Sequence, residues 1–164
     1  MSGSAGGSFF SSSSKHTMYP FVIDGPGFFS SGPYVQYQFD ETQDDFLEAN
    51  FGVIPDHVNL NTNPILYFSV RGASAANGNY DVLIEVRYKE DGEEPLGSAE
   101  DSDQSTYAAG TLNEQKTFSL ELTGSSMAVG DEVFLKLQRL GASSVNDTQT
   151  GRMLLHDLRI EFSI

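Results

Sequence analysis

The sequence predicts an all-β protein, an antiparallel β-sandwich of jelly-roll-like type that follows an extended N-terminal arm. Three observations support this prediction. Apolar and polar residues alternate with a period of two in one segment after another from about residue 34 onward. Turn-forming residues such as Asn77-Gly78-Asn79 separate these segments. Finally, no window of the 164 residues combines helical periodicity with helix caps.

Each predicted strand places apolar residues on one face and mostly polar residues on the other. Pro55 ends the second strand, and Leu83 interrupts the alternation of the fourth. Seven or eight such strands, joined by turns and two longer loops, favour two packed antiparallel sheets. In chain order the predicted strands are residues 34–39, 47–53, 65–71, 81–89, 117–123, 132–138 and 154–164.

Residues 1–33 are predicted to form an arm, and residues 34–164 the sandwich domain. Gly-Ser runs and the Gly25-Pro26-Gly27 segment give the arm a composition that forms no core of its own. The arm nevertheless carries large aromatic side chains, which a plain linker does not need. Exposed on a monomer they favour aggregation, whereas docked into a neighbouring subunit they act as anchors. The six predicted partner anchors are Phe9, Phe10, Tyr19, Phe21, Phe28 and Phe29.

The chain has a formal net charge of −14 and a pI near 4.3. A field of this sign repels phosphate backbones, so we expect no nucleic-acid partner. No segment has the length and apolarity of a membrane span, and the first residues do not read as a secretory signal, so we expect no membrane partner. The absence of Cys excludes disulfides, a thiolate nucleophile and a Cys-based zinc site.

Acidic residues are densest in the predicted loop from Glu90 to Asp103. A cation such as calcium needs several oxygens that converge at short range. The D-x-D-x-D-G spacing of a calcium loop is absent from this stretch, so we favour a solvated loop over a calcium site.

No motif indicates catalysis. His16 lies in the arm, His57 follows a predicted strand end, and His156 falls on the apolar face of the last strand. A solitary His of this kind is more often a hydrogen-bonded structural residue than a metal ligand or a catalytic base. No two of the three histidines have the spacing of metal ligands on one strand. The G-x-S-x-G motif of serine hydrolases is absent. We therefore predict a protein that is not an enzyme and that uses no metal or cofactor.

A local structural motif is predicted around the strand at 132–138. Gly130-Asp131 suits a turn into this strand, and Arg139 at its end is expected to pair with Asp147 or Asp157. Such a pair ties the following loop to the sheet. The residues with this predicted structural role are Gly130, Asp131, Arg139, Asn146 and Asp147.

The stretch from about Phe51 to the C-terminus resembles jelly-roll modules of tailed-phage virion proteins, of the capsid decoration (cement), head-fibre and tail-fibre types. Residues 51–58 (FGVIPDHV) look like a strand and a Pro-Asp entry into the strand at 64–70. Residues 80–88 are similar to the long strand that follows. Residues 130–139 (GDEVFLKLQR) match a Gly-Asp turn and an alternating strand that ends in Arg. The Asn-Asp-Thr loop at 146–148 and the apolar strand at 151–162 complete the resemblance.

The resemblance implies a structural virion protein, most directly a capsid decoration protein that binds the shell through its N-terminal arm and stabilises it. Its partners would be the major capsid protein or other virion proteins, and we expect a homo-oligomer on the capsid surface, assembled in the host cytoplasm. A head-fibre or tail component is the neighbouring alternative. A carbohydrate-binding β-sandwich module is the alternative of another class, with a row of aromatic side chains drawn from Tyr34, Tyr67, Tyr80, Tyr88 and Tyr107.

Overall fold

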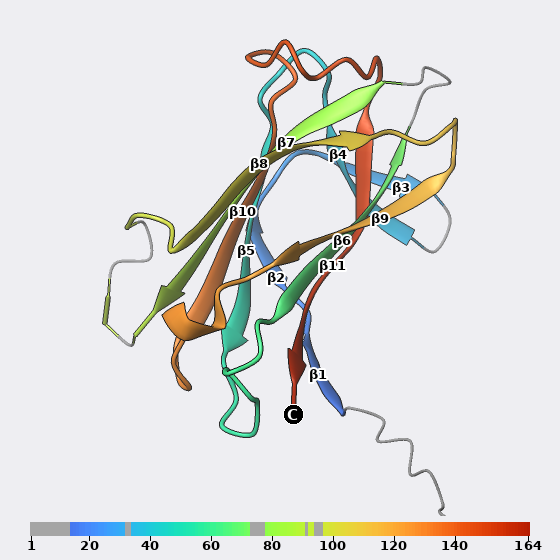
Figure 1. The fold of residues 1–164 in the computed structure, drawn as a ribbon. Helices are drawn as coiled ribbons and strands as arrows, with labels where there is room; N and C mark the ends of the chain where they lie inside the picture. Colours follow the sequence, from blue (N-terminus) through green and yellow to red (C-terminus); the bar gives the residue numbers. More distant parts are fainter. Residues whose placement is uncertain (1–13, 32–33, 73–77, 91, 94–96) are drawn as a thin grey trace, which may run out of the picture.

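The computed structural model describes residues 14–31, 34–72, 78–90, 92–93 and 97–164. These residues form β-strands, all paired antiparallel, and one short 3-10 helix. Two sheets pack face to face (Figure 1), which confirms the predicted all-β sandwich. The elements are β1 (Lys15–Met18), β2 (Phe21–Asp24), β3 (Phe28–Ser31), β4 (Tyr34–Phe39), β5 (Phe46–Val53), β6 (Ile65–Gly72), β7 (Asn79–Lys89), β8 (Asp101–Ala108), β9 (Gln115–Glu121), η1 (Gly124–Ser126), β10 (Glu132–Arg139) and β11 (Met153–Ser163).

The two sheets differ in strand order. Sheet A has the order β3-β4-β11-β6-β9, and β1 also pairs with β11. Sheet B has the order β2-β5-β10-β7-β8. From β8 onward the chain alternates between the sheets, since β9 and β11 lie in sheet A and β10 lies in sheet B. Strands that change sheet in this way are typical of a jelly roll.

The core lies between the sheets and is built from the inward-facing residues of each alternating strand. Burying one such side chain stabilises the fold by about 1.5–3 kcal/mol. The strands that the alternation predicts best are those with fully apolar inner faces. Their buried residues are Leu66, Phe68 and Val70 of β6, Val82, Ile84 and Val86 of β7, and Val133, Leu135 and Leu137 of β10.

The structure differs from the predicted boundary at residue 33. Strands β1, β2 and β3 lie within the range expected to be an arm, and they pair with β11, β5 and β4 respectively. Met18 of β1 is buried in the core. The two sheets therefore extend back to residue 15. Four-residue strands beside Gly and Ser show too few alternations to be recognised from sequence alone.

Two further differences concern β8 and β11. β8 occupies residues 101–108, of which 101–103 were expected to belong to the acidic loop. This strand could not be recognised from sequence because its residues, DSDQSTYA, include no run of apolar residues. In β11 a β-bulge between Leu155 and Asp157 shifts the register. Met153 and Leu155 therefore belong to the core together with Leu158, whereas an unbroken alternation would place residues 154 and 156 there. Leu154 is buried as well, but outside this core cluster.

The hydroxyl of Tyr80 is an exception to the rule that buried polar groups form hydrogen bonds. Its side chain is fully buried, and its hydroxyl has no hydrogen-bond partner among the described residues. Burial raises the pKa of Tyr80 to about 12. We expect Tyr80→Phe to leave the free energy of unfolding unchanged or to raise it by up to about 1 kcal/mol, because the substitution removes an unsatisfied polar group.

The raised pKa also predicts a loss of stability at alkaline pH. Below pH 10 the Tyr80 phenol is protonated in both the folded and the unfolded protein, so its contribution to the free energy of unfolding is fully present. As the pH rises toward about 12, the unfolded protein releases this proton first, and the free energy of unfolding falls. Thermal unfolding between about pH 8 and pH 12 is the measurement, and Tyr80→Phe is expected to show a shallower decline. Identical pH profiles for the two proteins would contradict this prediction.

Candidate docking surface

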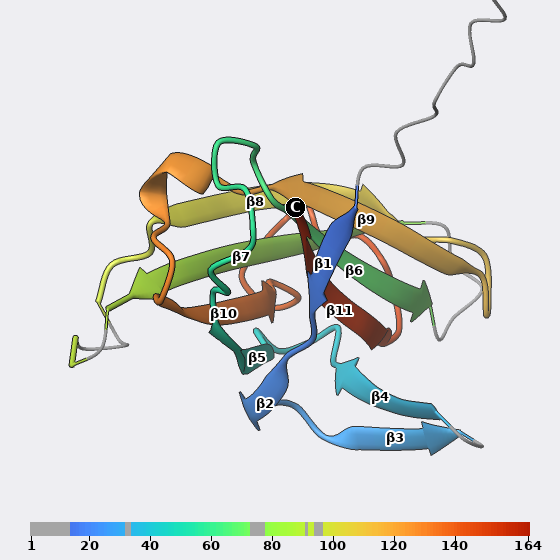
Figure 2. The same cartoon turned by 90° about the horizontal axis from the view of Figure 1, so that it is seen from below.

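Residues 15–24 cross the side of the sandwich from one sheet to the other. β1 pairs with β11 in sheet A, whereas β2 pairs with β5 in sheet B. Pro20 stands between the two strands, and it cannot continue the β1 ladder because it has no N–H. Figure 2 shows this blue segment passing from β1 to β2. The crossing makes β2 the outer edge strand of sheet B.

The outward side of this segment is apolar and exposed. Tyr19 is 66% exposed, Phe21 77% and Ile23 56%. The three residues line one and the same surface hollow, so they lie on the same side of the segment. We call them the β2 patch. Beyond β5, β2 has no strand partner among the described residues, so one row of its backbone groups is also unpaired.

A shallow hollow of about 500 Å³ lies beside the β2 patch. Asn50, Phe51, Gly52 and Glu132 form its other walls. Gly52 has a positive φ of 82° at an irregularity in the pairing with β10, and an added Cβ there would meet no neighbouring atom. The hollow is thus an open apolar surface with a carboxylate at its margin.

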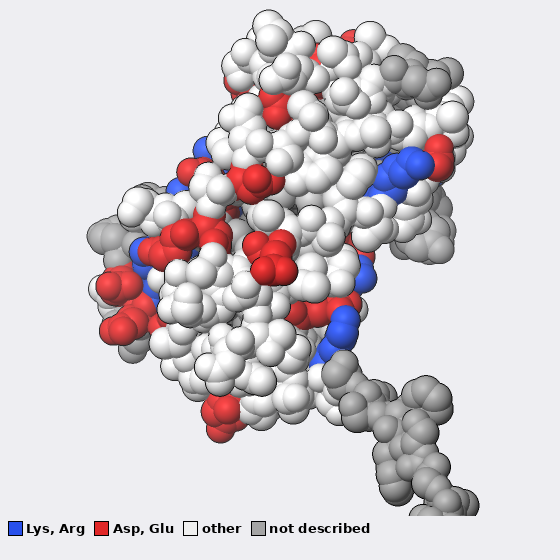
Figure 3. Space-filling view, in the orientation of Figure 1, with Lys and Arg blue, Asp and Glu red and all other residues white. Residues whose placement is uncertain are grey.

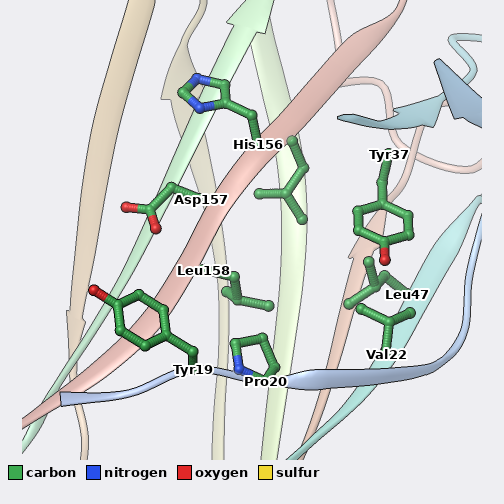
Figure 4. A pocket seen from close by; sticks show the side chains of 9 residues that line it. Tyr19, Pro20, Val22, Tyr37, Leu47, His156, Asp157 and Leu158 are labelled. Atoms are coloured by element: carbon green, nitrogen blue, oxygen red, sulfur yellow. The ribbon is translucent and has the colours of Figure 1, made fainter. Parts of the chain in front are cut away.

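A second cavity, of about 230 Å³, opens between the sheets behind the β1–β2 crossing. Figure 4 shows Tyr37, Leu47 and Val22 on one side of it, with Leu158 and Pro20 lower in the view. His156 and Asp157 lie on the far side from Tyr37, and the Asp157 carboxylate accepts a hydrogen bond from Arg159. Burial raises the pKa of Tyr37 and lowers that of His156.

The structure places the six predicted anchors in three groups. Tyr19 and Phe21 belong to the exposed β2 patch. Phe28 and Phe29 lie in β3, where their backbones pair with Tyr37 and Gln36 of β4. Phe9 and Phe10 lie outside the described residues.

The predicted structural motif forms around β10. Gly130 has a positive φ of 98°, and the Asp131 carboxylate accepts a hydrogen bond of 2.7 Å from the Ala128 N–H, which closes the turn before the strand. Asn146 lies exposed in the loop that follows β10, where its N–H donates to the Ser144 hydroxyl.

Arg139 is fully buried, and of its two expected partners it binds Asp147. The pair is bidentate, with Nε donating to Oδ2 at 2.9 Å and Nη2 to Oδ1 at 2.7 Å. The guanidinium also donates to the carbonyl oxygens of Gln149 at 2.6 Å and Gly151 at 2.7 Å, and it lies over the Tyr80 ring. Arg139 therefore holds loop 140–152 against the sandwich; it is a structural residue.

The structure also brings together two histidines that sequence reasoning kept apart. Nδ1 of His16 in β1 lies 3.1 Å from Nε2 of His57, and the two exposed rings meet edge to face. Asp56 lies 3.6 Å from the other nitrogen of His57. The contact is long-range, between residues 41 positions apart, so no local spacing could have revealed it. His156 lies at the β-bulge of β11 instead of on a regular apolar face.

Carboxylates of the predicted acidic loop bind other groups of the chain. Figure 3 shows Asp and Glu gathered at the end of the molecule where β7 meets β8. Asp101 accepts hydrogen bonds from the Tyr88 hydroxyl and from Thr123, and Glu100 pairs with Lys89 at 2.6 Å. Within the described residues no group of three or more His, Asp or Glu side chains is arranged to hold a metal ion. The same residues contain no helix that is long and apolar enough to span a membrane.

Of the five tyrosines considered for a carbohydrate-binding row, the four whose side chains the structure describes do not form one. Tyr80 and Tyr88 are buried, and Tyr107 packs against Phe68 and Phe118. Tyr67 is half-buried beneath the Arg159 guanidinium. The side chain of Tyr34 lies outside what the structure describes.

No protein-family model and no curated protein matches this sequence. Among solved structures, the chain is similar to the family 35 carbohydrate-binding module from Cellvibrio japonicus Abf62, with a TM-score of 0.48, 10% identity, and 90% of this chain and 92% of that chain covered. It is also similar to the family 29 module CBM29_1 from Piromyces equi (TM-score 0.46, 10% identity, 92% and 91% covered). A third likeness is to the enzymatically active domain of tailspike protein 4 of bacteriophage CBA120 (TM-score 0.45, 8% identity). The matched region spans 93% of this chain and 19% of that chain. At these identities the likenesses concern the fold alone.

Proposed function

We propose that this chain is a non-enzymatic structural protein of a tailed-phage virion, most directly a capsid decoration protein that docks through its N-terminal segment. One observation carries the proposal. Phe21 on the edge strand β2 and Tyr19 just before that strand, two of the predicted anchors, are 77% and 66% exposed. Large aromatic side chains that become buried on docking supply much of the energy of a protein interface. The virion assignment is supported by the sequence resemblance of residues 51–164.

The surroundings of the β2 patch define the chemistry of its partner. Glu132 lines the adjoining hollow, and Asp24 of β2 lies opposite Glu48 of β5. The chain as a whole carries a net charge of −14. The complementary surface is therefore an apolar one bordered by Lys or Arg. The unpaired edge of β2 also offers backbone groups to an added strand of the partner.

The test compares particle binding by the full chain and by the double variant Tyr19→Ser/Phe21→Ser. Both side chains are largely solvent-exposed, so we expect the thermal midpoint to change little. Loss of two aromatic anchors is expected to weaken binding by about 30-fold or more. Co-sedimentation of purified chain with virus particles that lack it measures the affinity.

Val145→Ser is the matched control, because Val145 is 92% exposed and belongs to loop 140–152, which lies at the opposite end of the sandwich from β1 (Figure 1). We expect it to bind particles as the unmodified chain does. Equal binding by all three proteins would contradict a docking role for the β2 patch. Binding to separated tails instead of heads would assign the chain to the tail alternative.

Carbohydrate binding is the second candidate, and a specific row of residues favours it. In the register of sheet B, Phe21 lies opposite Asn50, Asn50 opposite Phe134, and Phe134 opposite Arg87. Aromatic rings and amide or guanidinium groups on one open sheet face suit stacking against sugar rings and hydrogen bonding to hydroxyls. Phe134→Ala separates the candidates in the same experiment. It is expected to reduce glycan binding if the sheet face binds sugars, and to leave particle binding intact if the β2 patch docks.

A further inference from the structure

We propose that the cavity behind the β1–β2 crossing is a socket for one aromatic ring of residues 9 and 10 from a second copy of this chain. The inference rests on the proposed function and deepens it, because it assigns a receiving site to the N-terminal segment. We call the cavity, lined by Pro20, Val22, Tyr37, Leu47, Leu155 and Leu158 together with Tyr19, His156 and Asp157, the β11 socket.

The socket lies where sheet A lacks a strand. β4 pairs with β11 as far as Leu155, and β1 pairs with β11 from Ile160 onward. Both strands lie along the same edge of β11, since β6 occupies the other edge. Residues 156–159 therefore have no strand partner on this edge among the described residues. The gap is of the length that a short added strand fills.

The shape and chemistry of the socket suit an apolar side chain. Its volume of about 230 Å³ is smaller than the ~300–1,000 Å³ typical of small-molecule sites. Val22, Leu47 and Leu158 give it an apolar lining. In an added strand successive side chains point to opposite faces, so one of Phe9 and Phe10 enters the socket and the other points outward.

The chain's own residues 9 and 10 cannot reach the socket. The Ser14 carbonyl accepts a hydrogen bond from the Ile164 N–H, at the end of β11 remote from the gap. About six residues of β11, or ~20 Å, separate Ile164 from the gap. Phe10 precedes Ser14 by four residues and Phe9 by five, which span at most ~14 Å and ~18 Å. Because β1 runs toward the gap, the chain before it would also have to reverse direction, and a reversal takes about four residues.

Charge also favours this occupant. Residues 2–14 contain no Asp, Glu, Lys or Arg, so a segment of a second copy meets no repulsion from an acidic body. The contact joins the N-terminal segment of one molecule to the side of the next. Such a head-to-tail contact closes into a ring or continues as a row, both of which suit a protein that bridges subunits of a shell.

The first test measures self-association of three full-length proteins by sedimentation equilibrium. The unmodified chain is expected to form species larger than its 17.9 kDa monomer as concentration rises. Phe9→Ser/Phe10→Ser removes the inserted ring, and Val22→Phe fills the socket from within; each is expected to weaken association by about tenfold or more. The arm variant is expected to keep the thermal midpoint of the unmodified chain. Unchanged association in both variants would overturn the proposal.

The second test uses the absence of Cys in the chain. Val22→Cys is mixed with Phe9→Cys or with Phe10→Cys under mild oxidation, and peptide mapping identifies the linked residues. One of the two mixtures is expected to give a disulfide between different molecules. The proposal would be overturned if no link formed between residue 22 and residue 9 or 10. It would also be overturned if such a link formed only within one molecule, in a chain that carries both Cys residues.

Particle binding measured on the same variants separates this inference from the proposed function. If the arm variant associates normally while Phe21→Ser, which changes no residue of the socket lining, fails to bind particles, the socket is wrong and the virion role stands. If the socket variants become monomeric while no variant binds particles less well, the socket stands and the virion role loses its support.

Discussion

Replacing Arg139 by Met is expected to destabilise the fold by about 3–5 kcal/mol, because the substitution leaves the Asp147 carboxylate buried without its cation. The Asp147 side chain is 2% exposed and the Arg139 side chain is fully buried, so water cannot replace the missing partner. Two backbone carbonyls, of Gln149 and Gly151, lose their donor as well. Total stabilities of domains are about 5–15 kcal/mol, so a loss of this size is a large share of the whole.

The measurement is urea unfolding of Arg139→Met, Asp147→Asn and the double variant. The single variants are each expected to be less stable than the unmodified chain, and the double variant to be more stable than the sum of the single losses predicts. Asn146→Ala is the control, since Asn146 is exposed in the same loop, and it is expected to change stability by less than about 0.5 kcal/mol. Additive losses would mean that the two side chains act independently.

The parts of the fold that could be predicted from sequence are the strands in which apolar and polar residues alternate regularly within the strand itself. Val133, Leu135 and Leu137 alternate with polar residues, and β10 buries them as expected. The pairing of Arg139 with Asp147 could also be predicted as one of two candidate pairs, because both residues lie close together in sequence beside a predicted strand end.

Other features depend on contacts between distant segments and could not be predicted. β1 is a strand because Lys15 lies opposite Ser163 and Met18 opposite Ile160, not because of its own four residues. The bulge in β11 and the gap between β4 and β1 arise from the same distant pairings. The β11 socket exists only where those features meet, so no sequence motif marks it.

The anchoring role of the N-terminal aromatic residues stays a prediction. Aromatic residues in a Gly- and Ser-rich segment suggested anchors, and the structure shows that Tyr19 and Phe21 are exposed. The sequence did not indicate that they belong to a sheet edge. The outward direction of Phe21 follows from the pairing of β2 with β5, in which Val22 lies opposite Ala49 and packs against the core.

Deletion of residues 1–33 is expected to prevent cooperative folding, whereas deletion of residues 1–13 is expected to leave it intact. The longer deletion removes β1, β2 and β3 and so exposes an edge of β11, of β5 and of β4. It also removes Met18 from the core. These losses together are comparable to the whole stability of a domain of this size. The shorter deletion removes none of the described residues.

Thermal unfolding followed by circular dichroism measures both proteins. A sharp transition for the shorter deletion and none for the longer would show that residues 15–31 are part of the sandwich. Two equally cooperative transitions would instead restore the boundary at residue 33. The result decides how anchoring is tested, because loss of particle binding by a protein that does not fold says nothing about anchors. If only the shorter deletion folds, it isolates Phe9 and Phe10 from the β2 patch, and any loss of self-association in it belongs to those two residues and their neighbours.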